Sequence, residues 1–230
     1  LHLDIDPEPD GLMETGAEFI DWFENELLPS GISMLPEKLN VPASEVSALL
    51  KTHIRLCYDV CHFAIGYEPQ EKVIAQLKEK GIQIGKIQIS AALKAGIGPA
   101  FDRTAIKEAF SGYNEPVYLH QVVARKEDGS LLRYPDLTEA LADYERPGVT
   151  EWRAHFHVPV FSQQFGVLQS TQQNIREMLE IQKTNPVTQH LEVETYTWEV
   201  LPPLLKLPLQ DSIIRELQWV TEILQNGEIK

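Results

Sequence analysis

The sequence has little of what would place it outside the cell or in a membrane. It contains only two cysteines, Cys57 and Cys61, among 230 residues. Small secreted domains usually depend on several disulfides, so we expect both thiols to be reduced and buried. No apolar run approaches the roughly 20 residues that span a bilayer, and the chain does not open with a signal-peptide pattern. These absences predict a cytoplasmic protein without membrane insertion.

Positive charge is also scarce. The 20 lysines and arginines face 34 aspartates and glutamates, which gives a formal net charge of −14. A surface this acidic repels nucleic-acid backbones and anionic lipids, so the composition argues against a nucleic-acid partner. The hydrophobic share of 43% and charged share of 23% are typical of a globular protein. We therefore expect a single domain over residues 1–230 that acts on a small-molecule metabolite.

Apolar runs and amphipathic segments alternate over the first 90 residues. Strands are predicted at residues 1–6, 54–59 and 82–90. Helices are predicted at residues 14–28, after an N-cap at Ser44, and at residues 70–80, with Pro29 and Gly31 ending the first helix and Gly81 the last. Crossovers of this length indicate parallel strand pairing.

The alternation is interrupted at residues 91–150, which we interpret as an inserted, substrate-side elaboration. It should contain helices near 104–110 and 137–144 and a hairpin turning at Asp128-Gly129. The main pattern then resumes with a strand in "WRAHFHVPVF", a helix at 167–183 and a strand in "HLEVETY". A rigid "LPPLLKLP" connector and a helix at 212–224 form a C-terminal helical extension over 200–230.

The strand count indicates part of a barrel. About four strands can join a parallel wall, whereas a closed (β/α)8 TIM barrel has eight over about 250 residues. We therefore predict an α/β chain that supplies mainly the C-terminal half of a TIM barrel. The other half would precede Leu1, where a longer polypeptide is expected, or come from a second copy in a homo-oligomer.

Four of the apolar segments end in side chains that can bind a divalent metal: Asp6, Asp59, Gln88 and Glu194. Parallel barrels build active sites at the carboxyl ends of their strands. Three carboxylates and an amide form an oxygen-rich set, which suits Mn²⁺ or Mg²⁺ better than a closed Zn²⁺ site, although Zn²⁺ stays an alternative. Each residue also has a plainer interpretation: Asp59 as a helix cap, Gln88 as a hydrogen-bonded core residue, and Glu194 as an outward-facing side chain.

Further candidates lie beside these four. His62 follows Asp59 by three residues and can face the same ion, and Glu8 competes with Asp6 as the ligand on the first strand. Alternation in an extended run puts Arg153, His155 and His157 on one side, where the imidazoles can chelate a metal or bind substrate and the guanidinium can bind an anion.

These motifs resemble those of the xylose-isomerase-like TIM barrels, the sugar isomerases and epimerases related to hydroxypyruvate isomerase. "IDPEP" is similar to their "I-E-P" strand end, "YDVCH" to D-x-x-H, "IGKIQIS" to I-G-H-I-Q-I-A, and "LEVETY" to the last-strand L-x-x-E-Y, all in the family's order. "LDIDPEPDGLMET", "CYDVCHFAIGYEP" and "HFHVPVF" further resemble the EboE family of metabolite-traffic proteins within this superfamily. The resemblance covers nearly the whole chain but only the C-terminal half or more of the family's barrel.

The resemblance implies a metal held by Asp6, Asp59, Gln88 and Glu194, with His62, His155 and His157 lining the pocket. In the endonuclease IV branch a D-x-H motif stands where His155 and His157 stand here, so these histidines could ligate a second metal. The chain departs from the family pattern at Asp6, where a glutamate is usual, and at Lys86, which replaces the histidine of I-G-H-I-Q and would face substrate.

The expected function is a metal-dependent isomerase or epimerase acting on a small sugar, polyol or hydroxy acid, within secondary-metabolite biosynthesis or traffic. Asp6 and Glu194 would exchange a proton with the substrate carbon while the metal stabilises the negative charge. The alternatives are a metabolite carrier without turnover and a metal-dependent hydrolase of the endonuclease IV type.

Overall fold

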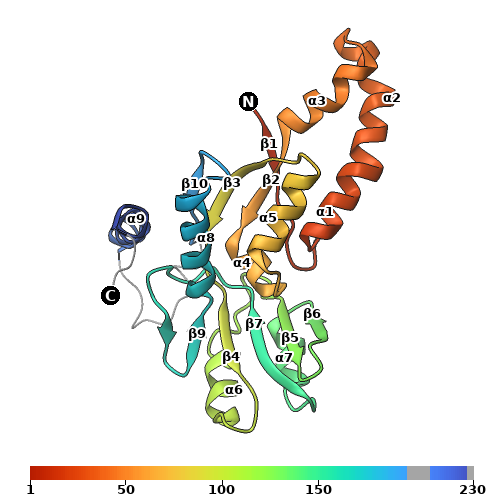
Figure 1. Cartoon of the computed structure of the whole chain (residues 1–230). Coiled ribbons are helices and arrows are strands. Elements are labelled where there is room, and N and C mark those ends of the chain that lie inside the picture. The colour runs from red at the N-terminus through yellow and green to blue at the C-terminus, as the bar shows by residue number, and fades with distance from the viewer. Residues whose placement is uncertain (196–207, 227–230) are drawn as a thin grey trace.

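A computed structural model describes residues 1–195 and 208–226 of the chain. Two β-sheets lie end to end, a parallel sheet near the N-terminus and an antiparallel sheet at the opposite end, with helices packed around both (Figure 1). The predicted α/β class is confirmed in this coarse form, because a parallel sheet packed with helices is present. Within the described residues the sheet does not close into a barrel.

The parallel sheet has the order β1-β2-β3-β10, from β1 (Leu3–Ile5), β2 (Ile54–Asp59), β3 (Ile84–Ile89) and β10 (Leu191–Val193). These four strands match the four predicted apolar runs, and every neighbouring pair is parallel as predicted. The register pairs Asp59 with Gln88, and Gln88 with Glu192. One face of this sheet therefore carries polar side chains across adjacent strands, while the alternate residues Tyr58 and Ile87 are fully buried on the other face.

The first helical segment runs further than predicted. It consists of α1 (Gly16–Trp22), η1 (Phe23–Leu27) and α2 (Leu28–Leu39), so Pro29 and Gly31 do not end it. The segment η1 is a π-helical turn, in which the N–H of Leu28 bonds the carbonyl of Phe23. This wider turn lies just before Pro29, whose missing N–H and fixed φ are tolerated at the start of the following helix.

The next helices are α3 (Ala43–His53), α4 (Val60–Ile65) and α5 (Gln70–Glu79). Of these, α3 and α5 confirm predicted helices with one correction at a cap, while α4 agrees with the alternative interpretation of Asp59 as a helix cap. The N-cap of α3 is Pro42 rather than Ser44, which lies inside the first turn, because Pro42 already has the extended backbone that an N-cap requires. After α5 the chain reverses at Gly81 with a positive φ of 65°, as predicted.

The antiparallel sheet has the order β6-β5-β7-β4-β9-β8. Its strands are β4 (Leu93–Gly96), β5 (Val122–Lys126), β6 (Leu131–Tyr134), β7 (Val149–Ala154), β8 (Gln164–Phe165) and β9 (Leu168–Ser170). The hairpin between β5 and β6 turns at Gly129, whose φ is 82°, as predicted. The sheet extends past the expected insertion boundary at residue 150 and ends at residue 170.

A strand is present in "WRAHFHVPVF" as predicted, but the prediction of its partner strands was wrong. The strand β7 pairs antiparallel with β4 and β5, and it ends at Ala154, so the run does not belong to the parallel sheet. Residues 155–158 have no regular secondary structure. An apolar run predicts burial but does not specify which neighbouring strand supplies the hydrogen bonds, and the prediction failed for that reason.

The remaining helices are α6 (Arg103–Ser111), α7 (Leu137–Ala142), α8 (Gln172–Thr184) and α9 (Leu209–Asn226). The helix predicted at 167–183 starts five residues later, because residues 168–170 form β9. Most of the "LPPLLKLP" connector lies outside the described residues. Within residues 1–195 and 208–226, none of the helices combines the length and apolar character needed to cross a membrane.

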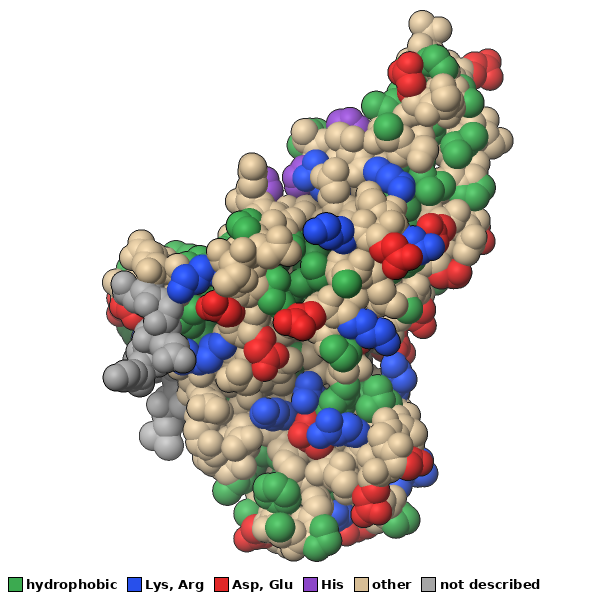
Figure 2. Space-filling model, viewed as in Figure 1, with side chains coloured by type: hydrophobic (Ala, Val, Ile, Leu, Met, Phe, Trp, Pro, Cys, Tyr) green, Lys and Arg blue, Asp and Glu red, His purple; other side chains and the backbone are tan. Residues whose placement is uncertain are grey.

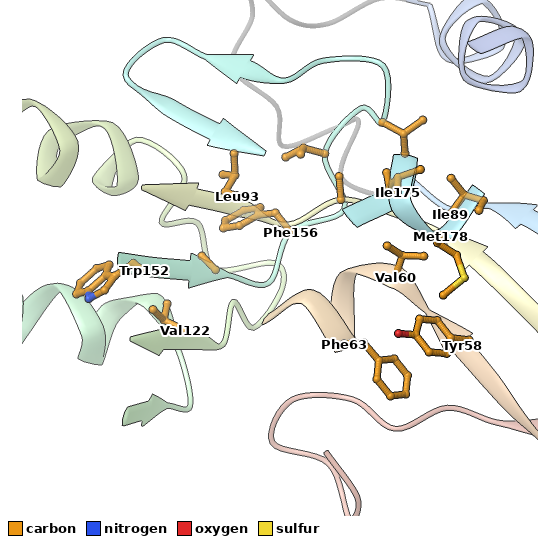
Figure 3. Close-up of a cluster of buried hydrophobic side chains, with 14 of the residues drawn as sticks. Tyr58, Val60, Phe63, Ile89, Leu93, Val122, Trp152, Phe156, Ile175 and Met178 are labelled. Carbon is orange, nitrogen blue, oxygen red and sulfur yellow. The ribbon is translucent and has the colours of Figure 1, made fainter. Parts of the chain in front are cut away.

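One continuous hydrophobic core joins the two sheets (Figure 3). Tyr58 and Phe63 stack at 4.1 Å between ring centroids on the parallel-sheet side, and Trp152 packs on the antiparallel side. Phe156 follows β7 and is 1% exposed within the same core. The segment after β7 is therefore fixed where the sheets meet, although it is not a strand.

Candidate metal centre

Asp59 is the carboxylate around which the candidate site is arranged. It ends β2, caps α4 and is fully buried. Its Oδ1 accepts hydrogen bonds from the His62 backbone N–H at 3.0 Å and from Ser90 Oγ at 2.7 Å. Its Oδ2 is also buried, and within the described residues no N–H donates to it, while the Glu194 carboxyl lies in hydrogen-bond contact with the Asp59 side chain. The predicted alternative of a helix cap therefore applies to one oxygen, while the other could share a proton with Glu194 or bind a cation.

Three imidazoles converge beside Asp59. His62 lies in α4, whereas His155 and His157 lie in the segment after β7, and all three are at most 6% exposed. The Nε2 atom of His155 lies 3.1 Å from Nε2 of His62 and 3.2 Å from Nε2 of His157. Nitrogen ligands about 2.0–2.1 Å from one ion lie at comparable spacings from each other. His62 and His155 are 93 residues apart in the chain, and the fold brings their imidazole nitrogens together.

Acceptors at the outer nitrogens determine which imidazole atoms face the centre. His62 Nδ1 lies 3.2 Å from Asp6 Oδ1 and 3.2 Å from the Pro7 carbonyl oxygen. His155 Nδ1 lies 2.7 Å from Gln121 Oε1. These oxygens favour a proton on each Nδ1, so in the neutral form of each ring Nε2 is the atom that can offer a lone pair to a metal.

Two groups of side chains could each hold an ion. Asp59, His62 and His157 form one, Cys61, His155 and His157 form the other, and within each group the ligand atoms lie within 4.8 Å of one another. Burial and the nearby carboxylates raise the pKa of the Cys61 thiol, and its Sγ donates to the Phe156 carbonyl at 3.5 Å. A metal would have to displace the proton of this thiol, whereas the lowered pKa of Asp59 leaves its carboxyl already ionised, so the group containing Asp59 is the better candidate.

The charges inside the cluster are unequal. Burial opposes ionisation of Asp59, but His62 and His157 outweigh it and lower the pKa of this carboxyl. Burial also opposes protonation of His62, yet Asp59 and Asp6 raise its pKa to about 9. Burial lowers the pKa of His157 to about 4, and burial with the neighbouring His62 lowers that of His155. The positive charge of protonated His62 therefore balances the negative charge of Asp59. A bound metal cation would take over this role.

Glu194 lies at the edge of the cluster, just after β10. Its Oε2 lies 3.9 Å from His157 Nδ1. Within the described residues, no N–H group donates a hydrogen bond to this oxygen. The side chain is 31% exposed. Burial and the Asp59 carboxylate raise the pKa of Glu194 to about 8, so the group is mostly protonated at neutral pH. A protonated carboxyl at the rim of a buried centre can donate a proton to a ligand.

The ligand atoms of the cluster, carboxylate oxygens and imidazole nitrogens, are of types that bind a divalent metal ion. The carboxyl groups of Asp59 and Glu194 lie within hydrogen-bond reach of each other, and this contact helps to raise the pKa of Glu194. Neither Asp59 Oδ2 nor Glu194 Oε2 has another hydrogen-bond partner in the described part of the chain, and two buried carboxyls are costly together unless a proton or a cation lies between them. Imidazole nitrogens suit Zn²⁺, Mn²⁺ or Fe²⁺ better than Mg²⁺. The donor set is richer in nitrogen than the sequence indicated.

Several predicted site residues have other contacts. Gln88 Oε1 accepts from Cys57 Sγ at 2.7 Å, and Lys86 pairs with Glu192 at 2.5 Å. Arg153 donates from Nε to Glu151 at 2.8 Å. Glu8 is exposed, and no hydrogen bond or ion pair of its side chain lies within the described residues. Of the predicted residues, the structure brings together Asp6, Asp59, His62, His155, His157 and Glu194.

Some residues of the site were not predicted from the sequence. Gln121 supports His155, and Ser90 supports Asp59. His120 is fully buried, stacks on Phe156 at 3.7 Å between ring centroids, and contacts the His155 carbonyl oxygen at 3.0 Å. The only available signal in the sequence was the segment "LHQ", a histidine beside an amide in an otherwise apolar run.

A large cavity lies away from this cluster. It has a volume of about 790 Å³ and lies at the opposite end of the parallel strands, between α5 and the segment before β10, where Arg55, Lys78 and His190 contribute to its lining.

Comparison with known proteins identifies no relative, since no family model, curated protein or solved structure matches the chain. The site is therefore interpreted from its own geometry.

Proposed function

We propose that this protein is a divalent-metal-dependent enzyme of the isomerase or epimerase type, acting on a small sugar, polyol or hydroxy acid in a metabolite pathway. The supporting observation is the convergence of Asp59, His62 and His157 at one buried point, with Glu194 at its edge. A divalent ion held there would polarise a hydroxyl or carbonyl of the substrate. The nitrogen-rich donors favour Zn²⁺ or Mn²⁺ as that ion.

The residues around this point are suited to moving a proton on carbon. Asp6 and Glu194 are both about a third exposed, at 32% and 31% of their side chains, so substrate can reach them, and both carboxyls have a raised pKa because of burial. A group with a pKa near the working pH exchanges protons most effectively. Glu194 would give and take the proton at the substrate carbon, and Asp6 would do so from the other side while it holds His62.

The test is hydrogen exchange at carbon. The protein, loaded with Mn²⁺ or Zn²⁺ and incubated in D₂O with small aldoses, ketoses, polyols and hydroxy acids, should incorporate deuterium at a carbon-bound position, as read by NMR. Glu194→Gln should lower this exchange by about 10²–10⁴-fold, because it removes a general acid and base. Glu192→Gln, two residues away and paired with Lys86, is the matched control and should retain the exchange.

The result can also reject the proposal. Ligand binding with no exchange and no metal would instead identify a metabolite carrier. The two overlapping donor groups that share His157 favour one further candidate, a metal-dependent hydrolase with more than one ion. Two or three Zn²⁺ per chain, measured by elemental analysis, together with hydrolysis rather than exchange, would establish that candidate.

A further inference from the structure

Positive charge is concentrated on one face of the antiparallel sheet, beside α4 and the segment that carries His155. Lys94 of β4, Arg125 of β5 and Arg153 of β7 alternate with buried residues such as Trp152 and Ala124, so all three lie on the opposite face, the one on which α4 packs against part of the sheet. Figure 2 shows lysine and arginine side chains gathered over β4 and β7, next to α4. Such a concentration is unexpected in a chain that has 34 acidic residues and only 20 basic ones.

The two arginines are held rigidly. Glu151 accepts from Arg153 Nε at 2.8 Å and from Arg125 Nη2 at 3.2 Å, so a single carboxylate serves both guanidinium groups. Both groups also lie over the ring of Tyr67, with the Arg153 and Arg125 Cζ atoms 3.9 and 4.9 Å from its centroid. Arg153 Nη2 and Arg125 Nη1 form no hydrogen bond within the part of the chain that the structure describes. Their N–H groups are therefore fixed in space and available to an acceptor.

Lys94 is the least neutralised cation of the three. It lies directly opposite Arg153 in the register of β4 and β7, and like charges in that position are destabilising. Its ammonium group forms no hydrogen bond or ion pair within the described residues. Burial and Arg153 lower the pKa of Lys94. Glu151 and Glu177 oppose this shift, but Glu151 already accepts hydrogen bonds from both arginines, and Glu177 accepts one from Gln173 at 3.2 Å.

The backbone beside this patch, which consists of Lys94, Arg125 and Arg153, is unusual as well. Tyr67 has a φ of 56°, a left-handed conformation that is uncommon for an aromatic residue. This conformation brings its hydroxyl within 3.4 Å of the Glu151 carbonyl oxygen and its ring under the guanidinium groups. The chain thus adopts an unfavourable backbone geometry where the two arginines are stacked.

We propose that Lys94, Arg125 and Arg153 form a binding site for a small tetrahedral oxyanion, inorganic phosphate or the phosphoryl group of a metabolite. Planar guanidinium groups offer paired N–H donors to such an anion, and the ammonium group adds a point charge. The anion would also relieve the repulsion between Lys94 and Arg153. The site shares no side chain with the metal centre, and its phosphate binding can therefore be measured separately from the proposed isomerase activity.

The probe is inorganic phosphate, titrated into the full chain and followed by calorimetry, with acetate at equal ionic strength as the carboxylate comparison. The wild-type protein should bind phosphate saturably and acetate more weakly. Lys94→Gln and Arg125→Gln should each weaken phosphate binding by about tenfold or more, the loss expected for one charged hydrogen bond. Lys38→Gln, on the exposed end of α2, removes the same charge and should leave binding unchanged.

Two further measurements separate this site from the metal centre and from an effect of misfolding. Asp59→Asn, which impairs the metal centre, should bind phosphate as the wild type does, because phosphate held by a bound metal ion would be lost in this variant. Lys94→Gln should unfold at a temperature no lower than the wild type, because it removes repulsion, so weak binding cannot be ascribed to misfolding. The proposal is overturned if the wild type binds no phosphate, if Lys94→Gln binds it equally well, or if acetate binds as tightly.

Discussion

At the scale of single residues, the metal centre depends on the outer partners of its histidines. Gln121 contacts His155 twice, since its side-chain oxygen accepts from Nδ1 at 2.7 Å and its backbone oxygen accepts from the His155 N–H at 2.8 Å. Partners of this kind fix the imidazole tautomer and typically contribute 10–100-fold to metal affinity. His155 Nε2 lies 3.1 and 3.2 Å from the Nε2 atoms of His62 and His157, so it can join Asp59, His62 and His157 as a further ligand. Gln121→Met keeps the length of the side chain but removes the acceptor, so Zn²⁺ affinity should fall by about that factor in a chelator competition.

Gln121→Glu provides the matched comparison. A carboxylate oxygen can accept the same hydrogen bond, so this variant should keep most of the affinity that Gln121→Met loses. Equal Zn²⁺ affinities for Gln121→Met and the wild type would show that the tautomer of His155 does not matter for binding.

Most of the residues that form the candidate site were identified from the sequence. Asp59, His62, His155, His157 and Glu194 stand out because ionisable side chains in apolar runs are costly unless something pairs with them. Their partners were not visible, because contacts such as that of His155 with Gln121 join residues 34 positions apart and have no periodic pattern. Cys57 and Cys61 are buried and free as predicted, but their thiols contact Gln88 and a main-chain carbonyl, which no motif indicates.

At the scale of elements, the positions of the parallel strands and of most helices could be predicted from the sequence. The partners of β7 could not. The strands β1, β2 and β3 are short apolar runs that end at prolines, a helix cap or a loop, so their positions follow from the sequence. The strand β7 has the same signature but pairs antiparallel with β4 and β5. Its pairing is decided by contacts with residues 93–96 and 122–126, which local sequence does not encode.

The helix α9 carries a buried acid that makes stability depend on pH. Glu216 is 1% exposed, and its Oε1 accepts from the Val160 backbone N–H at 3.0 Å and from Thr195 Oγ1 at 2.6 Å. Burial raises its pKa to about 7 from an ordinary value of 4.5, and the two hydrogen bonds offset only part of this. Between these two values the folded state holds a proton that the unfolded state has lost, so stability falls as the pH rises through this range.

Glu216→Gln should remove this dependence, because a neutral amide still offers Oε1 to Val160 and Thr195. The difference in unfolding temperature between about pH 5 and about pH 8 should become smaller in the variant, with the gain at the higher pH. Glu222→Gln, on an exposed position of the same helix, is the control and should leave the wild-type profile unchanged. Identical profiles for Glu216→Gln and the wild type would contradict a protonated Glu216 in the folded protein.

At the scale of the whole molecule, the metal centre lies between the two sheets. Asp59 and His62 come from the end of β2 and from α4, while His155 and His157 follow β7 of the other sheet. An ion bound by both pairs would cross-link segments that are about 93 residues apart in the chain, as His62 and His155 are. A ligand that binds only the folded state stabilises it by about 4 kcal/mol at 1,000 times its Kd.

For a chain of this length, that stabilisation corresponds to an increase of about 8–16 °C in the unfolding temperature. Zn²⁺ or Mn²⁺ added to chelator-treated protein should produce an increase of this order in differential scanning calorimetry, and renewed chelation should reverse it. Asp59→Asn should abolish most of the increase, because it removes the charged ligand, whereas Asp143→Asn, on the surface beside Arg146, should keep it. If the metal raises the unfolding temperature of Asp59→Asn as much as that of the wild type, the ion binds elsewhere and the two sheets are joined by their apolar core alone.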